Sequence, residues 1–318
     1  MARINICPWP TKPGGWIERQ PVDNNDYYWR VICGDTSGQI LYAAVGNAGH
    51  VYRSGDGGQS WTNIAAPVRD WYGLACSADG THLIIAAYNG RLYTSTNSGS
   101  SWTERQPAGA NNMRWSYVAS DADGTNLIAV INIGRIYTSA DSGATWTERR
   151  PAGNNDRGWQ TCASNNDGSI LVAACNSTNG RLYISTNSGV SWTEATPSGA
   201  ADKNWQCSAS DYDGSNLIVG VDGGRLYVSA DSGTSWTEVQ PLGNTTGNWA
   251  SASLSSDGSH IFVADYSHRL WSSADGGSTW TEQRPIDAAD HNWWPVAVNA
   301  DGTRMAAGVF PGRIFTYS

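Results

Sequence analysis

Short apolar and alternating stretches, each closed by a turn signal, recur along the whole chain. In the segment 71–107, the stretch WYGLAC is followed by Asp79-Gly80, and the nearly continuous apolar run LIIAAY is followed by Asn89-Gly90. Both dipeptides are hairpin-turn signals. The third stretch is RLYTS, and the fourth, SWTERQP, ends at Pro107, which suits a sheet edge because proline donates no ladder hydrogen bond. Since no stretch keeps a helical period over about 11 residues, the pattern predicts four short β-strands per segment and no helix.

Tryptophan positions give the period of this pattern. Fourteen of the 17 tryptophans fall into two sevenfold series whose members are 41 to 46 residues apart. The series that opens the fourth stretch of each unit is Trp16, Trp61, Trp102, Trp146, Trp192, Trp236 and Trp280. The series that opens the first stretch is Trp29, Trp71, Trp115, Trp159, Trp205, Trp249 and Trp293. Four-strand units with a period of about 40–45 residues are typical of β-propeller blades, so we expect seven blades.

The two ends of the chain carry complementary halves of one unit. The N-terminal TKPGGWIERQP contains a turn and a fourth strand without a third, and the C-terminal GRIFTYS is a third strand without a fourth. The sequence therefore predicts an all-β fold, a seven-bladed β-propeller of four-stranded antiparallel blades, with the ring closed by the N-terminal strand pairing with the C-terminal strand. We expect one domain, 1–318, with blades at approximately 29–67, 71–107, 115–151, 159–197, 205–241, 249–285 and 293–318, the last completed by 14–21.

The turn before the fourth strand follows the pattern S-x-[DN]-x-G-x-[ST]-W. Asp or Asn accepts hydrogen bonds from backbone N–H groups further along the turn, glycine supplies a positive φ, and tryptophan covers the turn. The copies are Ser54-Asp56-Gly58-Trp61, Ser95-Asn97-Gly99-Trp102, Ser139-Asp141-Gly143-Trp146, Ser185-Asn187-Gly189-Trp192, Ser229-Asp231-Gly233-Trp236 and Ser273-Asp275-Gly277-Trp280. This pattern resembles the Asp-box, or BNR repeat, of sialidases and related β-propellers, and it extends over nearly the whole chain.

The resemblance to sialidases implies an arginine triad, a tyrosine nucleophile with a glutamate partner, and an acidic aspartate. Arginines recur once per blade at the start of the third strand, at Arg91, Arg135, Arg181, Arg225, Arg269 and Arg313. A sialidase site is asymmetric, so we expect a sialidase-like fold without an evident sialidase active site and assign no catalytic residue. The arginines are interpreted either as braces between adjacent blades or as a repeated binding site, because guanidinium groups suit carboxylates and ring hydroxyls.

The remaining acids and cysteines give no catalytic or metal-binding pattern. A glycosidase needs two carboxyl groups about 5–9 Å apart in environments that separate their pKa values. The only acids outside the repeat near the end of a second strand are Asp222 and Asp265, and we expect them in surface or turn roles. The six cysteines form no CxxC or Cys/His spacing suited to zinc. We therefore lean against an enzyme and expect neither a cofactor nor a metal.

Loops rich in Gly, Asn and Asp connect each fourth strand to the next blade, as in PAGANNMRW and PAGNNDRGW. Each loop ends in a tryptophan of the second series. An indole face beside amides and carboxylates is a good platform for a sugar. The candidate ligand-binding residues are therefore the seven tryptophans of the second series together with the six repeated arginines. The alternative is that these tryptophans only wedge adjacent blades together.

Charge and hydropathy limit the partners. The net charge is −8 at pH 7, and the chain has two lysines and no basic run. This argues against nucleic acid, because phosphate binding relies on clustered lysine and arginine. No window approaches 18 apolar residues, and no apolar signal-peptide region is visible. We expect no membrane insertion. The compartment stays open, with an extracellular or cell-surface role as the expectation.

Repetition favours binding over catalysis, since several equal weak sites on a rigid scaffold gain avidity. The leading interpretation is a non-catalytic binding propeller, lectin-like, with a carbohydrate or glycoconjugate partner at repeated sites between blades. The alternative is a protein-interaction or assembly scaffold with a protein partner. Asp-box-like propellers also resemble photosystem II assembly factors, although those contact their partner through a basic patch. A second alternative is a glycoside hydrolase of the sialidase or xyloglucanase type.

Overall fold

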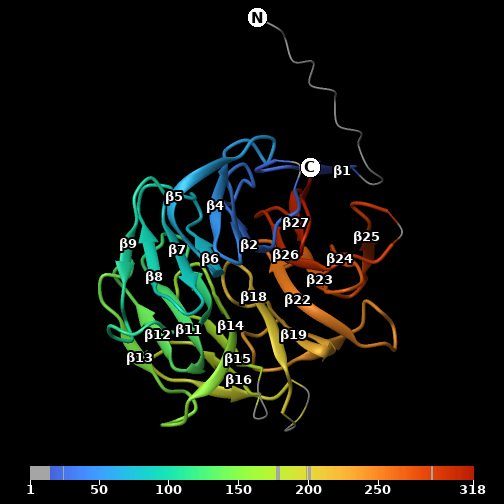
Figure 1. Cartoon of the computed structure of the whole chain (residues 1–318). Coiled ribbons are helices and arrows are strands. Elements are labelled where there is room, and N and C mark those ends of the chain that lie inside the picture. Colours follow the sequence, from blue (N-terminus) through green and yellow to red (C-terminus); the bar gives the residue numbers. More distant parts are fainter. Residues whose placement is uncertain (1–14, 24, 177–179, 198, 200–201, 288) are drawn as a thin grey trace, which may run out of the picture.

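The computed structural model describes residues 15–23, 25–176, 180–197, 199, 202–287 and 289–318. This part of the chain contains 28 β-strands and no helix, and the strands form antiparallel four-stranded blades arranged in a ring (Figure 1). Blades 1 to 4 consist of β2 (Trp29–Gly34), β3 (Leu41–Val45), β4 (Gly49–Ser54) and β5 (Thr62–Arg69); β6 (Trp71–Cys76), β7 (Leu83–Ala87), β8 (Leu92–Ser95) and β9 (Thr103–Arg105); β10 (Trp115–Ser120), β11 (Leu127–Gly134), β12 (Ile136–Ser139) and β13 (Thr147–Arg149); and β14 (Arg157–Ser164), β15 (Leu171–Cys175), β16 (Leu182–Ser185) and β17 (Thr193–Ala195). Blades 5 to 7 consist of β18 (Trp205–Ser210), β19 (Leu217–Gly224), β20 (Leu226–Ser229) and β21 (Thr237–Val239); β22 (Gly247–Leu254), β23 (Ile261–Asp265), β24 (Leu270–Ser273) and β25 (Thr281–Gln283); and β26 (Trp293–Val298), β27 (Met305–Val309), β28 (Ile314–Tyr317) and β1 (Trp16–Arg19).

The N-terminal strand closes the ring, as the split unit predicts. β1 pairs antiparallel with β28, with Trp16 opposite Tyr317 (Figure 1). Trp16 is fully buried and stacks on Phe262 of blade 6, with ring centroids 5.8 Å apart. Gly14, where we expected the closing segment to begin, lies outside the described residues. The first described strand and the last one therefore belong to the same blade.

The first strands of neighbouring blades contact one another all the way round the channel. At one end of the channel, a circle of backbone hydrogen bonds links each blade to the next. The donor and acceptor residues are Thr36 to Ala78, Ala78 to Ala122, Ala122 to Asn166, Asn166 to Tyr212, Tyr212 to Ser256, Ser256 to Ala300 and Ala300 to Thr36, with N···O distances of 2.7 to 3.1 Å. This circle contains one residue per blade and returns to its starting point, which confirms the seven-bladed ring.

The apolar core lies between neighbouring blades. The second strands are buried on both faces, as the continuous apolar run 83–87 predicts. Between blades 1 and 2, Tyr42 and Val51 from one blade meet Trp71 and Ile85 from the other. Because each blade shares its core with both neighbours, no blade can bury its apolar faces alone.

The turn before the fourth strand has the local geometry that its sequence predicts. In blade 3, the Ser139 hydroxyl accepts a hydrogen bond from the backbone N–H of Gly143 at 2.9 Å. The Asp141 carboxylate accepts one from the N–H of Thr145 at 2.7 Å, and the Trp146 indole donates to the Gly143 carbonyl at 3.0 Å. The side chains of Ser139, Asp141 and Trp146 all bond within the turn, so these contacts have a structural role.

Candidate functional site

The two faces of the ring carry different connections. The turns between first and second strands and the Asp-box turns lie on one face, which we call the turn face. The turns between second and third strands and the loops between blades lie on the other, which we call the loop face. On the turn face, the channel ends in a cavity of about 180 Å³ that all seven blades line with similar short segments. Differences between blades concentrate instead at the channel mouth on the loop face.

Each first strand has a β-bulge near the loop face. Its register with the second strand shifts directly after the tryptophan in every blade, for example between Trp29 and Val31. A bulge leaves its extra residue out of the ladder and re-aims the side chain. The extra residues are Arg30, Tyr72, Ser116, Gln160, Gln206, Ala250 and, in a longer bulge, Trp294 with Pro295. An irregular set of side chains therefore surrounds the mouth of a regular ring.

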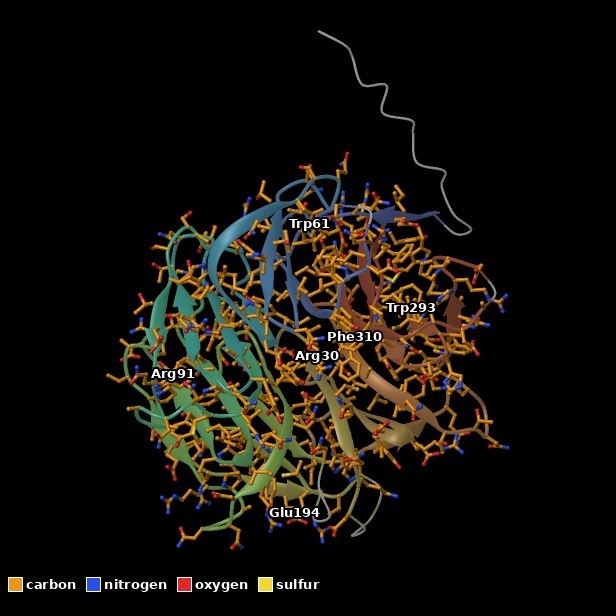
Figure 2. The ribbon with its side chains drawn as sticks, in the orientation of Figure 1. Arg30, Trp61, Arg91, Glu194, Trp293 and Phe310 are labelled. Carbon is orange, nitrogen blue, oxygen red and sulfur yellow. The ribbon has the colours of Figure 1, made fainter. Side chains whose placement is uncertain are left out.

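Arg30 contacts aromatic rings from both neighbouring blades. Its guanidinium carbon lies 4.1 Å from the ring centroid of Tyr72 in blade 2 and 4.1 Å from that of Trp294 in blade 7. The Phe310 ring is 5.5 Å away. Figure 2 shows Arg30 and Phe310 close to the middle of the ring. Each cation–π contact contributes about 0.5–2 kcal/mol, more as water is excluded, so the rings hold the guanidinium in place.

Further aromatic side chains extend this contact. Tyr88 stacks on Tyr72 with ring centroids 4.4 Å apart, and Phe310 lies 5.6 Å from Trp294. The exposed Tyr28 meets Phe310 edge-on at 5.0 Å. We name the set Tyr28, Arg30, Tyr72, Tyr88, Tyr266, Trp294 and Phe310 the mouth cluster. Its members come from blades 6, 7, 1 and 2, so it occupies one side of the mouth.

No carboxylate within the described part of the chain forms a direct ion pair with Arg30, although Asp70 interacts with its charge electrostatically. The guanidinium forms no hydrogen bond or ion pair with any residue described there. Burial lowers the pKa of Arg30, while the nearby Tyr72 and Asp70 oppose that shift. The Asp70 carboxylate instead accepts a hydrogen bond from the backbone N–H of Asn47 at 2.7 Å. A half-buried guanidinium with unused donors is suited to an external carboxylate or carbonyl group.

The other side of the mouth carries polar residues. Asn176 donates to the Gln160 side chain at 2.8 Å in blade 4, and Asn204 donates to the Asp222 carboxylate at 3.1 Å in blade 5. The mouth therefore has an aromatic, cationic side and an amide-rich side. Different blades therefore contribute different residue types, so the two sides of the channel mouth are chemically distinct, unlike those of a perfectly repeated ring.

Ile133 on the loop face combines exposure with backbone strain. It is 64% exposed and has a φ of +62°. The corresponding turns of other blades place Asn89 and Gly223 at positive φ, residue types that tolerate it. A branched side chain in this conformation costs about 1–2 kcal/mol. Since an exposed side chain recovers none of that cost by packing, Ile133 is a second candidate contact residue.

The second tryptophan series, which we expected to form a ligand platform, is buried. All seven side chains are 2% exposed or less. The indole N–H groups of Trp29, Trp71 and Trp159 donate to backbone carbonyls at 3.0 to 3.1 Å. The geometry therefore supports the alternative in which these residues wedge the blades together. A sugar could reach the rings only if the blades separated, so their ligand-binding role stays a prediction without geometric support.

The repeated arginines fasten the loops between blades. Arg135 donates to the carbonyls of Gly153 and Asn154 at 3.1 and 2.6 Å, and its Nε lies 2.9 Å from the Asp156 carboxylate. Equivalent loop contacts are made by Arg91, Arg181, Arg225, Arg269 and Arg313. Blade 1 has His50 at this position, and its loop is the short PVRDW. The arginine and the long loop occur together, so each arginine fastens the connection between its own blade and the next, in line with the brace interpretation. Its role as a repeated binding site stays a prediction.

Other chemical groups are dispersed. Within the described ranges, no three His, Cys, Asp or Glu side chains come together as a metal site requires. No helix there is long and apolar enough to cross a membrane. Asp265 is fully buried, accepts from the N–H of Asn248 at 2.8 Å and lies 3.2 Å from His268. Burial raises its pKa, whereas Asp222, in the neighbouring blade, is exposed.

Comparisons with known proteins agree with the propeller fold. Residues 153–301 match the family model described as the DUF6242 beta propeller domain. No curated protein matches the chain. The chain is similar to the structure of YCF48 bound to D1 peptide, with 15% identity, a TM-score of 0.70, and coverage of 99% of this chain and 96% of that one. It is also similar to YCF48 from Cyanidioschyzon merolae, at 14% identity and a TM-score of 0.71 over 95% and 98% of the two chains.

A third similar structure is the Cps50 (Swd1) beta-propeller domain of Myceliophteria thermophila, at 13% identity and a TM-score of 0.70 over 92% and 99% of the two chains. At these identities the matches establish the fold alone. The chain is a β-propeller of antiparallel four-stranded blades. Its resemblance to the Asp-box family stays a prediction, since the matching family model is a different one.

Proposed function

We propose that this chain is a protein-interaction propeller whose mouth cluster binds a segment of a partner protein. The observation that carries the proposal is the guanidinium of Arg30, held by aromatic rings at a position that does not repeat and left without an acceptor from the described residues. Truncating Arg, Tyr and Trp side chains tends to cost the most at protein interfaces. These are the residue types that make up most of the mouth cluster.

The alternative, binding of a carbohydrate through repeated sites, has less support. The tryptophans expected to stack on a sugar are buried, and the arginines expected beside them are engaged by loops. The solved structure of YCF48, a propeller of similar shape, contains a D1 peptide. That structure supports the use of this scaffold for a protein segment. It carries no information about the contacts here, since only 15% of residues are identical.

The geometry favours a segment with three features. An aspartate or glutamate would give Arg30 the charge-assisted acceptor that the described residues do not provide. Apolar side chains beside it would pack on the rings of Tyr28 and Phe310 or on Ile133. The backbone of the segment would exchange hydrogen bonds with the amides of Gln160 and Asn176 on the opposite side of the mouth.

A random peptide library displayed on phage tests this proposal. Selection on the wild-type chain is expected to enrich peptides that contain an acidic residue next to an apolar one. Affinity for a selected peptide should fall at least tenfold in Arg30→Gln, and Arg30→Lys should recover only part of it because lysine lacks the planar fork. The control is Arg284→Gln, which removes an exposed arginine whose partner is Glu282 and should leave affinity unchanged.

Two results would contradict the proposal. One is a failure to enrich any peptide on the correctly folded wild-type chain. The other is enrichment of peptides whose affinity is the same in wild type, Arg30→Gln and Trp294→Ala, which would place the binding surface elsewhere. A glycan that bound in an Arg30-dependent manner would favour the carbohydrate interpretation instead.

A further inference from the structure

In three blades an arginine occupies part of the space between neighbouring blades, and beside Arg149, between blades 3 and 4, a cavity of about 170 Å³ remains. Along the outer side of blades 2, 3 and 7, the fourth strand carries an arginine that reaches a threonine of the third strand. The Nε atoms of Arg105, Arg149 and Arg19 donate to the threonine hydroxyls at 2.9, 2.8 and 2.8 Å. In blade 7, the charge of Arg19 also interacts with Asp56 in the Asp-box turn of blade 1. The arginine thus lies across the gap between one blade and the next.

Blade 4 lacks this arginine. The strand register places Ala195 where blade 3 has Arg149, and Ile184 where blade 3 has Thr138. A groove of about 520 Å³ results between β17 and the Asp-box turn of blade 5. Gly233 in that turn is half-buried, although the equivalent glycines of the other complete Asp-box turns are buried. The groove is larger than its counterpart between blades 3 and 4, where Arg149 occupies part of the corresponding space.

Hydroxyl groups line much of the groove, and Glu194, which also lines it, is paired with Arg181. Thr193, Ser232 and Thr234 contribute hydroxyls, none of which is hydrogen-bonded to another residue of the described ranges. Strand alternation puts Glu194 on the face opposite Thr193 and Ala195. There, its carboxylate lies 3.2 Å from Arg181. The hydroxyls consequently keep both donor and acceptor capacity for a ligand.

The floor and one edge of the groove are apolar. Ile184 is buried beneath it, and Ala195 and Trp236 pack against the same core cluster. The indole N–H of Trp236 is already used, since it donates to the Gly233 carbonyl at 3.0 Å. What the indole offers to a ligand is therefore its apolar ring surface.

We propose that this groove is a single binding site for a neutral, polyhydroxylated ligand, a mono- or oligosaccharide being the chemical class. Its volume lies within the range of about 300–1,000 Å³ that is usual for small-molecule sites. Free hydroxyls complement ring hydroxyls, and an indole edge complements C–H groups. Because Glu194 is already paired with Arg181, the groove favours a neutral ligand over an anionic or cationic one. The site is independent of the mouth cluster and of the second tryptophan series, and we expect one such site per chain.

An array of neutral mono- to tetrasaccharides, followed by calorimetric titration of a bound one, tests the site. The wild-type chain is expected to bind with a stoichiometry of one. The double variant Ala195→Arg with Ile184→Thr copies the arrangement of blade 3, so it should fold normally and lose at least tenfold in affinity. Arg30→Gln should leave saccharide binding unchanged, which separates this site from the proposed peptide site.

The reverse exchange gives a gain-of-function test. Arg149→Ala with Thr138→Ile opens the corresponding space between blades 3 and 4 and should raise the stoichiometry toward two. The proposal is overturned if no neutral saccharide binds the wild-type chain. It is equally overturned if a saccharide binds but filling the groove with arginine leaves its affinity unchanged.

Discussion

The guanidinium of Arg30 lies 4.1 Å from the indole ring of Trp294, although the two residues belong to the first and last blades of the chain. They meet because β1 completes blade 7 and brings it beside blade 1. The proposed binding site therefore exists only in the closed ring. The split repeat thus leads to closure of the ring, and closure of the ring forms the site.

Closure of the ring should contribute strongly to stability. Replacing Trp16 by alanine removes a fully buried indole that packs between blades 6 and 7, and loss of a large buried aromatic side chain costs about 3–5 kcal/mol. We expect urea unfolding to show a loss of that order. Trp61→Ala, which removes only a half-buried tryptophan of the same series, is the control and should cost less. Equal losses in the two variants would contradict a special role for the closing strand.

Ile133 should lower the stability of the protein while contributing to peptide binding. Asparagine tolerates positive φ, as Asn89 does in the equivalent turn of blade 2. Ile133→Asn is therefore expected to raise the free energy of unfolding by about 1 kcal/mol through relief of strain, while weakening the binding of a selected peptide. Val190→Asn replaces another exposed apolar residue and should change neither quantity. A loss of stability in Ile133→Asn would show that the isoleucine is held by packing.

The turn aspartates should make stability depend on pH in the acid range. Hydrogen bonds from the Ser255 hydroxyl and from Ser259 lower the pKa of Asp257 from 3.8 to about 2. A depressed folded-state pKa contributes stability that is fully present above about pH 4 and is lost as the pH falls through about 2. Asp257→Asn should therefore show a smaller decline in urea midpoint between pH 5 and pH 2.5 than the wild type. Parallel declines would rule out this contribution.

Each repeated arginine should stabilise the loop that it contacts without stabilising the rest of the propeller. Arg135→Ala removes two hydrogen bonds and an ion pair to the loop that contains Gly153 and Asp156. We expect faster hydrogen exchange of backbone amides in that loop and a global loss of only about 1 kcal/mol. His50→Ala, at the same position in the blade with the short loop, should leave loop exchange unchanged. Faster exchange throughout the propeller would contradict a role confined to the loop.

Repetition explains which features could be predicted from the sequence. Strand number, turn geometry and ring closure follow from patterns present in every blade, so each copy supports the others. The same reasoning chose ligand contacts that the geometry does not support. Tryptophans that recur once per blade, such as Trp115 and Trp159, are expected both for a repeated ligand platform and for a wedge between blades. Only the burial of the side chains distinguishes these two roles.

The candidate site was missed because its residues do not repeat. Arg30, Tyr72 and Trp294 each follow a series tryptophan, and comparison of that one position across blades would have revealed the difference. The sequence pattern does not predict the β-bulge that redirects these side chains. Nor does it predict that ring closure brings them into contact. The same comparison detects the substitution beside the groove, since the fourth strand of blade 4 reads TEA where those of blades 2 and 3 read TER.

A double-mutant cycle between Arg30 and the acidic residue of a selected peptide tests the central claim most directly. The four affinities are measured by titration calorimetry for wild type and Arg30→Gln, each with the acidic peptide and with its glutamine or asparagine analogue. We predict that either change alone weakens binding at least tenfold, about 1.4 kcal/mol, and that the second change then adds little. Fully additive losses, or no loss in Arg30→Gln, would contradict the assignment of Arg30 as the residue that receives the partner's carboxylate.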